Sequence, residues 1–332
     1  MGLTRVARIE RYVQAVQADI VSCANEQPFD EGEPVWIDGY HTDVADLLIS
    51  HDVPGELQEE VASKLTCPGC NSQLEIWQDV GTRFDFEVAH DSTIEKALRK
   101  YGKQLFSFDR FLQQSPLLGA THPFGKRILK EIQKARRTAI PKQDWFRAKA
   151  DKAQGFGLAP REFVPDQRYN SSGQACWYLS NSANTAIAEL RARSAWVQRF
   201  EIGPLDAILD LRSWRADEDR AFDDEGNYTP PHDLLVISLI YCELLSQTLD
   251  DCQHPTATGT SAKRQWKPEY LLTRFVADAA SVAGFSGILY ASVRSFGDNL
   301  VVFDQACRPQ TLGHPEFIEV ELPEYYSHSP PR

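Results

Sequence analysis

Apolar residues recur at helical spacing along the first 138 residues of the chain. The pattern predicts helices over residues 4–21, 43–49, 54–65, 92–106 and 124–137. Polar residues occupy the positions between the apolar ones, which is typical of helices that bury one face. Residues 1–138 are therefore expected to form a mainly α-helical N-terminal domain.

Beyond this point the pattern changes to short β-type runs separated by turn residues. Strands are predicted over residues 175–180, 196–202, 207–211, 287–292 and 299–304, and helices over 182–195 and 270–284. The segment 232–251 is apolar on most faces and is expected to be buried or packed at an interface. The polar segment 252–270 suits a surface loop or a lid. Residues 139–332 are therefore expected to form an α+β domain.

The composition agrees with an ordinary globular protein. Of the 332 residues, 42% are hydrophobic and 25% charged, and no apolar run approaches the roughly 20 residues needed to cross a bilayer. The N-terminal helix carries charges throughout its apolar periodicity and so lacks the apolar centre of a secretion signal. Seven scattered cysteines do not resemble a disulfide framework. We therefore expect a cytoplasmic protein with reduced thiols and no membrane partner.

The net charge and the lack of phosphate-binding motifs argue against several classes of function. The net charge of −12 argues against direct nucleic-acid binding, and the basic stretch at residues 125–137 is interpreted as a solvated helix face. The chain lacks the GxGxxG and GxxxxGK[ST] phosphate loops. Rossmann oxidoreductases and nucleoside triphosphatases therefore lose support.

The motif CPGC, with Cys67 and Cys70 separated by two residues, is the candidate metal site. Two thiolates at this spacing can bind one Zn²⁺ from a tight turn, but a complete site needs four ligands. Cys23, His41 and His51 are candidates for completing it. The flanking sequence lacks the strand and helix of a thioredoxin-type redox pair. A structural zinc site and a plain turn without metal both stay open.

Polar residues in the second half each interrupt an apolar neighbourhood, and the candidate set is Arg147, Arg168, Tyr178, Glu189 and Ser292. Glu189 is the most informative, because the apolar residues of its helix, ANTAIAEL, should face the sheet. A glutamate there either extends to solvent or is held inward for a purpose. Any one of these residues alone would be interpreted as a surface charge or as a core hydroxyl with a hydrogen-bond partner. The five together indicate a functional site only if they match the site residues of a known family.

Residues 145–304 supply that match and resemble the RES-domain family, which is named for its arginine, glutamate and serine. The motifs follow the family order: FRAKA, QRYNSSG, WYLSNS, TAIAEL, YLLTRFVADAA, GFSGILYASVR and NLVVFD. The sequence departs from the family at Gln167, Ser171 and Arg274, where glycine, proline and glutamine are common. The first 138 residues resemble only generally the helical, cysteine-bearing extensions of some long RES proteins.

The resemblance implies an ADP-ribosyltransferase-like fold, a split β-sheet that clasps NAD. It further implies an NAD-degrading, toxin-like enzyme that cleaves the nicotinamide–ribose bond, an NAD glycohydrolase or phosphorylase passing the ADP-ribosyl group to water or phosphate. The alternatives are an ADP-ribosyltransferase that modifies a protein target and a catalytically inactive NAD-pocket module with a regulatory or binding role. The implied partner is a helix-turn-helix, Xre-type antitoxin. The oligomeric state stays open, a homo-oligomer included.

The resemblance also assigns residue roles. Glu189 would hold the ribose 2′-hydroxyl and stabilise the oxocarbenium-like transition state. Arg147 and Arg168 would bind phosphate oxygens. Tyr178 would stack on nicotinamide or orient the ribose, and Ser292 would bond to the ribose or the carboxamide. These assignments make Glu189, Arg168, Ser292 and Tyr178 the expected catalytic set.

The loop after Arg168 completes the expected NAD-binding set. Tyr169, Asn170 and Gly173 lie on it, beside Arg147 and Arg168. Asn170 and Gly173 would shape the loop, and a glycine there allows a close approach of the backbone to the ligand.

Overall fold

The computed structural model describes residues 4–30, 33–34, 40–83, 85–151, 155–212, 229–230, 232–246, 267–303 and 308–320. The chain divides into two compact units, residues 1–92 with 216–229 and residues 93–215 with 230–332. Most of the expected loop 252–270 lies outside the described residues. No described helix has both the length and the apolar character that crossing a membrane requires.

The first unit has its helices where the apolar periodicity predicts them. They are α1 (Arg5–Asp19), α2 (Val44–Ser50) and α3 (Gly55–Ala62). Thr4 caps α1 by accepting a hydrogen bond from the backbone N–H of Ala7, and Asp43 caps α2 through the N–H of Asp46. The capping residues therefore fix the start of both helices as the sequence predicts.

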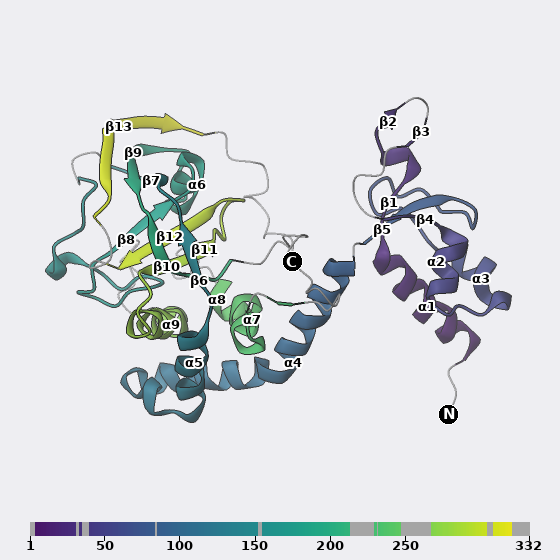
Figure 1. Ribbon diagram of the computed structural model, residues 1–332, viewed down its shortest axis with the longest axis horizontal. Helices are drawn as coiled ribbons and strands as arrows, with labels where there is room; N and C mark the ends of the chain where they lie inside the picture. The colour runs from purple at the N-terminus through teal and green to yellow at the C-terminus, as the bar shows by residue number, and fades with distance from the viewer. Residues whose placement is uncertain are drawn as a thin grey trace, which may run out of the picture. The chain divides into compact units, whose positions relative to one another are not determined.

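The first unit also contains strands that the sequence pattern did not predict. A three-stranded antiparallel sheet has the order β1-β5-β4, formed by β1 (Ile20–Cys23), β4 (Tyr40–Asp43) and β5 (Asp79–Thr82). A short pair, β2 (Phe29–Asp30) and β3 (Glu33–Pro34), follows the 3₁₀ turn η1 (Ala24–Glu26). Such short strands show too few alternations to stand out in a sequence. The unit is helical with a small sheet (Figure 1).

The second unit is built on an eight-stranded sheet with the order β13-β9-β7-β8-β12-β11-β10-β6. Its strands are β6 (Arg137–Ile140), β7 (Gln143–Lys149), β8 (Cys176–Ser180), β9 (Ser194–Ile202), β10 (Leu205–Asp210), β11 (Gly287–Ala291), β12 (Asp298–Phe303) and β13 (Gln310–Glu319). Among the strands that the structure describes, only β10 and β11 pair in parallel. The α+β class of this part of the chain is therefore as predicted.

The sheet almost divides between β7 and β8. Strand β7 pairs with β9 along its whole length, but it pairs with β8 only where Phe146 meets Ser180. Across the division the ring of Trp177 on β8 contacts Phe200 on β9 edge-on, with centroids 5.4 Å apart. The two parts of the sheet therefore share a core while being joined by a single residue pair.

Helices cover one face of the larger part of the sheet. They are α4 (Asp85–Gln114), α5 (Pro123–Lys134), α7 (Leu234–Tyr241), α8 (Glu243–Ser246) and α9 (Leu271–Val282), with the 3₁₀ turns η2 (Pro116–Thr121) and η6 (Pro268–Tyr270). Their apolar residues form one buried cluster with Leu209, Ile288 and Val301 of the sheet (Figure 1). The burial of α7 confirms the expectation for this part of the apolar segment 232–251, of which residues 247–251 lie outside the described residues.

The boundary between the units differs from the expected one after residue 138. Tyr101, Leu105 and Phe108 of α4, with Ile128 and Ile132 of α5, belong to the same buried cluster as the helices that cover the large sheet. Apolar burial places these N-terminal helices in the second unit, which begins at Thr93 within α4. Periodicity in the sequence shows that a helix has an apolar face, but not which core that face joins.

Helix α6 (Ala183–Glu189) is shorter than the predicted helix 182–195. Arg191 adopts a left-handed backbone conformation with φ of 56°, and β9 already begins at Ser194. The left-handed residue ends the helix, in the position where helices commonly terminate. The early ending places Glu189 at the last turn of α6.

Candidate active site

Glu189 owes its position to the way α6 is anchored. Ser182 caps the helix by accepting a hydrogen bond from the N–H of Thr185, and Ala186, Ile187 and Ala188 are buried. The helix packs on β7 and β9, and Ile187 lies in a cluster with residues of β9. Because the apolar side of α6 is fixed in this way, the carboxylate at its last residue is held at a defined place.

The Glu189 carboxylate is held by two donors from distant strands. Its Oε1 accepts hydrogen bonds from Ser292 Oγ and from Asn299 Nδ2, each at 2.7 Å. Asn299 is itself oriented by Ser180, whose hydroxyl donates to Asn299 Oδ1 at 2.7 Å. Glu189 is an exposed residue, but these two bonds fix its carboxylate, and its Oε2 has no hydrogen-bond donor among the residues that the structure describes.

A tight turn after β11 fixes the Ser292 hydroxyl. Ser292 Oγ accepts hydrogen bonds from the backbone N–H groups of Arg294, at 3.0 Å, and Ser295, at 3.1 Å. The backbone N–H of Ser292 donates to the carbonyl of Gly297 at 2.8 Å. Because the lone pairs of the hydroxyl are taken by the turn, its hydrogen points to Glu189. Glu189 and Ser292, expected in one site, lie together.

Arg168 is electrostatically coupled to the same carboxylate. Its guanidinium donates to the Leu245 carbonyl at 3.3 Å and lies 5.5 Å from the centre of the Tyr270 ring. Burial lowers the pKa of Arg168, but Tyr169, Tyr290 and other neighbours raise it by more. Glu189 is one of these neighbours, and the net effect is a raised pKa. Arg168 therefore remains a cation beside Glu189.

Two further arginines surround Glu189, and the sequence analysis did not assign them. Burial lowers the pKa of Arg294, and the neighbouring cation Arg191 lowers it further, whereas Glu189 acts in the opposite direction. Arg168 also lowers the pKa of Arg294. One carboxylate thus faces an excess of positive charge, which suits an anionic ligand.

The Tyr178 hydroxyl bonds to the loop that carries Arg168, and the expected role of this residue toward nicotinamide or the ribose stays a prediction. Its hydroxyl donates to Asn170 Oδ1 at 2.9 Å and accepts the backbone N–H of Tyr169 at 3.0 Å. Burial raises the pKa of Tyr178 well above its ordinary value, so the phenol is neutral. The hydroxyl is therefore engaged in holding the loop that carries Arg168.

Other contacts hold the same loop. Asn170 is buried and donates through Nδ2 to the carbonyls of Pro165 and Ser171, both at 3.0 Å. The Thr273 hydroxyl of α9 donates to the Arg168 carbonyl. Gly173 has a φ of 81°, a left-handed conformation that favours glycine. Asn170 and Gly173 shape the loop as expected, whereas the binding of NAD by this loop stays a prediction.

An ion pair ties the base of the loop to α9. Arg274 donates to Asp166 Oδ2 at 2.7 Å, and the side chains of the two residues are only 7% and 17% exposed. Arg274 also donates to the carbonyls of Tyr270 and Lys267. At this position, where the resembled family often has glutamine, the arginine therefore acts as an anchor between two segments.

The structure places Arg147 and Tyr169 in separate surroundings. Arg147, on β7, donates to the carbonyls of Phe156 and Gly157, both at 3.2 Å, and lies 5.5 Å from the centre of the Trp177 ring. Burial lowers its pKa. Tyr169 is buried, and burial raises its pKa to about 12. None of the contacts described for Arg147 reaches Glu189.

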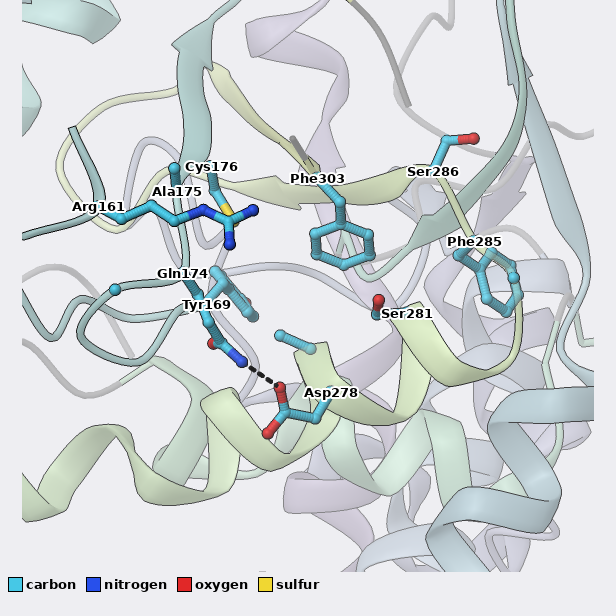
Figure 2. Close-up of a pocket in the computed structure, with 13 residues that line it drawn as sticks. Arg161, Tyr169, Gln174, Ala175, Cys176, Asp278, Ser281, Phe285, Ser286 and Phe303 are labelled. Atoms are coloured by element: carbon cyan, nitrogen blue, oxygen red, sulfur yellow. Dashed lines mark hydrogen bonds between the residues drawn. The ribbon is translucent and has the colours of Figure 1, made fainter. Parts of the chain in front are cut away.

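A cavity of about 450 Å³ is lined in part by the loop that follows Arg168 (Figure 2). Tyr169 and Gly173 line it, as do Gln174 and Asp278, which are joined by a hydrogen bond of 3.3 Å. Glu189, Ser292, Asn299, Arg168 and Arg294 do not line it. We place the candidate site at Glu189 because the titratable groups converge there, and not at this cavity.

The cysteine pair of the first unit lies in one turn, as predicted. Cys67 is buried and Cys70 exposed. Of the residues considered as further ligands, only Cys23 lies beside them, at 3.6 Å between its Sγ and that of Cys70. His41 and His51 instead pair with Asp79 and Asp19.

Asn299, Arg191 and Arg294 are the site residues that sequence reasoning missed. Arg191 and Arg294 follow Glu189 and Ser292 by two positions, and Asn299 begins the NLVVFD run. A polar residue beside each matched motif was the available signal. It could not separate these residues from ordinary surface residues without the tertiary structure.

Comparisons with known proteins found one family model and a solved structure that are similar to this chain. A solved structure with similarity to this chain is titled "Crystal structure of the M.tuberculosis MbcT-MbcA toxin-antitoxin complex"; the identity is 15%, the match covers 60% of this chain and 95% of that chain, and the TM-score is 0.33. No curated protein matches the sequence. The family model described as "RES domain" matches residues 135–319, which is more than half of the chain. The protein therefore belongs to the RES-domain family.

Proposed function

We propose that this protein is an enzyme that cleaves the nicotinamide–ribose bond of NAD and passes the ADP-ribosyl group to water or phosphate. The observation that best supports the proposal is the Glu189 carboxylate, held through Oε1 by Ser292 and Asn299 beside the guanidinium groups of Arg168 and Arg294. Membership of the RES-domain family supports it as well.

The chemistry explains why such a carboxylate is useful. When the bond between the ribose C1′ and the nicotinamide nitrogen breaks, both electrons leave with nicotinamide and the ribose becomes oxocarbenium-like. Glu189 Oε2 would accept the ribose 2′-hydroxyl and offset the developing positive charge, while Ser292 and Asn299 hold the carboxylate in place. A preorganised group of this kind contributes about 3 kcal/mol to transition-state stabilisation. Water then adds to C1′ and releases one proton to solvent.

The positive charge around Glu189 supports a role for the diphosphate of NAD. Arg168 and Arg294 would bind its oxygens, since guanidinium groups form strong, bidentate bonds to phosphate. The diphosphate would also relieve the mutual repulsion that lowers the pKa of Arg294. When inorganic phosphate is the acceptor, the same cations suit its charge.

The near-division of the sheet at Phe146 and Ser180 supports an ADP-ribosyltransferase-like architecture. Ser180 sits at this junction and orients Asn299, which in turn bonds to Glu189. The candidate site is therefore linked by hydrogen bonds to the place where the two parts of the sheet meet.

The test is to incubate purified protein with NAD, with and without phosphate, and to identify the products. Release of nicotinamide with ADP-ribose indicates a glycohydrolase, and formation of ADP-ribose 1″-phosphate indicates a phosphorylase. Label transfer from NAD to a protein acceptor would instead indicate an ADP-ribosyltransferase. Binding of NAD without consumption of it would indicate an inactive regulatory module and contradict the proposal.

Control of the activity is proposed to come from a separate antitoxin of the helix-turn-helix, Xre type. A free NAD-consuming enzyme would drain a shared cofactor in the cytoplasm, where we place the protein. An external partner needs only to place a few side chains against Arg168 and Glu189. Restored growth when a candidate antitoxin is co-expressed, together with co-purification, would support this partner.

A further inference from the structure

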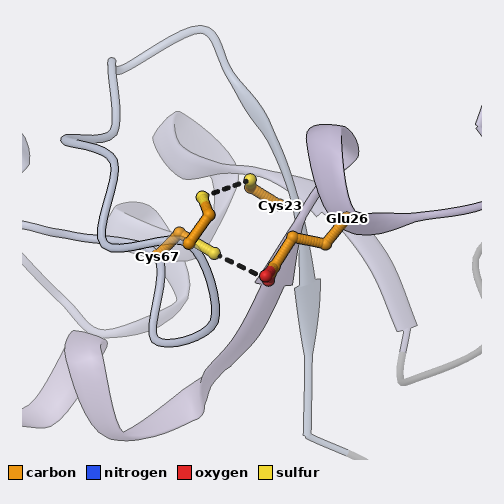
Figure 3. A group of neighbouring side chains, drawn as sticks. Cys23, Glu26 and Cys67 are labelled. Atoms are coloured by element: carbon orange, nitrogen blue, oxygen red, sulfur yellow. Dashed lines mark hydrogen bonds between the residues drawn. The ribbon is translucent and has the colours of Figure 1, made fainter.

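The first unit contains a group of side chains that the proposed activity does not use. Cys23, Glu26, Cys67 and Cys70 each offer one ligand atom, and these four atoms all lie within 4.8 Å of one another (Figure 3). Cys23 ends β1 and Glu26 belongs to η1, whereas Cys67 and Cys70 lie in the turn after α3. Two segments more than forty residues apart thus bring sulfur and oxygen ligands together.

We propose that these four residues bind one Zn²⁺ ion, which fastens the turn after α3 to the end of β1. This inference is independent of the proposed action on NAD. The donors are three thiol sulfurs and one carboxylate oxygen, all of which are established zinc ligands in proteins.

The distance between two of the sulfur atoms is close to that of a tetrahedral zinc site. With Zn–S bonds of about 2.3 Å, two sulfur ligands of a tetrahedral ion lie about 3.8 Å apart. The Sγ atoms of Cys23 and Cys70 are 3.6 Å apart. Cys67 Sγ lies 3.0 Å from Glu26 Oε2, to which its thiol donates a hydrogen bond. When zinc binds, the three thiol protons leave, and the Glu26 oxygen that accepted one of them is released to bind the metal.

Backbone hydrogen bonds close the turn that carries the two cysteines. The N–H of Cys67 donates to the Ser72 carbonyl at 2.8 Å, and the N–H of Asn71 donates to the Cys67 carbonyl at 2.9 Å. Asn71 has a φ of 58°, a left-handed conformation that asparagine tolerates in tight turns. Both thiols of CPGC are therefore presented from one hydrogen-bonded turn.

Gly69 gives a second, independent sign that the carboxylate belongs to the site. A Cβ at this position would lie 2.0 Å from Glu26 Oε1. The absence of a side chain at Gly69 thus allows Glu26 to approach the thiols. A plain turn would not need a glutamate packed on its glycine.

The main test measures zinc in the full-length protein purified under reducing conditions without chelator. We expect about one zinc per chain by elemental analysis. Cys23→Ser and Cys67→Ser should lose most of this zinc, whereas the matched control Cys176→Ser, outside the group, should keep it. Substitution with Co²⁺ in the wild-type protein should give the intense absorption of thiolate-to-cobalt charge transfer.

Two milder variants keep the proposal testable if the cysteine variants fail to fold. Glu26→Gln and Gly69→Ala should each weaken zinc binding at least about tenfold in competition with a chromophoric chelator, since losing even an outer-shell partner has that effect. The control Gly55→Ala should not, because a Cβ there has nothing within 4 Å.

The proposal is overturned if the reduced wild-type protein holds no zinc as purified and takes up none when Zn²⁺ is added. It is also overturned if Cys23 and Cys70 are joined by a disulfide in protein taken from a reducing cell. Alkylation of the free thiols in denatured protein, followed by mass spectrometry, detects that disulfide. Zinc that stays stoichiometric in both Cys23→Ser and Cys67→Ser would place the metal elsewhere.

Discussion

Asn299 Nδ2 donates a hydrogen bond of 2.7 Å to Glu189 Oε1, although 110 positions separate the two residues. Asn299 is the second residue of β12, and Glu189 ends α6. The bond exists only because β12 pairs with β8, where Ser180 orients the amide of Asn299. The carboxylate is therefore fixed by the sheet and not by its own helix alone.

Replacing Glu189 by glutamine should lower the turnover of NAD by more than about a hundredfold, because the variant keeps the size of the side chain but loses its charge. Nicotinamide release measured by chromatography checks the prediction. Glu316→Gln on β13, an exposed glutamate, is the matched control and should keep full activity. Full activity in Glu189→Gln would remove the role assigned to Glu189.

Removing the guanidinium of Arg294 should raise KM for NAD by about tenfold or more with a smaller effect on kcat, since a charge-assisted bond to phosphate contributes about 1.5–3 kcal/mol. Initial rates over a range of NAD concentrations separate the two parameters. Arg199 pairs with Asp144 on β7, and both side chains are exposed, so Arg199→Ala should leave both parameters unchanged. An unchanged KM in Arg294→Ala would show that the excess charge around Glu189 does not serve the diphosphate.

Tyr178→Phe should lower activity only a few fold and leave the pH profile of kcat unchanged. The hydroxyl is neutral because burial raises its pKa, and it bonds to Asn170 and to the Tyr169 N–H. Losing it leaves buried groups without a partner and should lower the free energy of unfolding by about 1–3 kcal/mol. A large loss of kcat with a changed alkaline limb would instead show Tyr178 acting as a proton donor. Tyr101→Phe, which loses a bond to Arg127 away from the site, is the control.

The ion pair of Asp166 and Arg274 should make stability depend on pH. Burial disfavours the Asp166 carboxylate, but the bonds from Ser172 and the charge of Arg274 outweigh it and hold the pKa below its ordinary value of 3.8. Because the folded state then binds fewer protons, the stabilisation is present above the unfolded pKa and is lost as pH falls through the lower, folded pKa.

Asp166→Asn should therefore lower the free energy of unfolding by about 3 kcal/mol near neutral pH. The difference from the wild type should shrink as pH falls below about 4. Urea unfolding at a series of pH values measures it. The exposed Asp206 provides the control variant Asp206→Asn, which should show little effect at any pH. A difference that is constant with pH would contradict the assignment.

A fragment of residues 139–332 should fail to fold, whereas residues 93–332 should fold cooperatively. The shorter fragment lacks α5 and the part of α4 whose Phe108 and Ile128 are fully buried in the core of the second unit. Circular dichroism and thermal unfolding compare the two. If residues 93–332 consume NAD at the rate of the full chain, the proposal of an external antitoxin stands. If they consume it much faster, residues outside the fragment inhibit the full chain.

The sequence by itself determined the local elements and the family. The positions of α1 and α2, the strands β8 and β12 and the burial of α7 follow from periodicity, which depends on neighbours a few positions apart. The matched motifs in their order led to the RES-domain family and to Glu189 and Ser292, which the structure brings together.

Tertiary structure alone decided which residues meet. Asn299 and Arg294 at Glu189, and Glu26 beside Cys67, come from segments whose spacing in the sequence carries no mark of their contact. The same holds for the core that α4 joins and for the single residue pair at the junction of the sheet. Contacts between distant segments depend on how the apolar faces are buried together, and a local pattern records only that such a face exists.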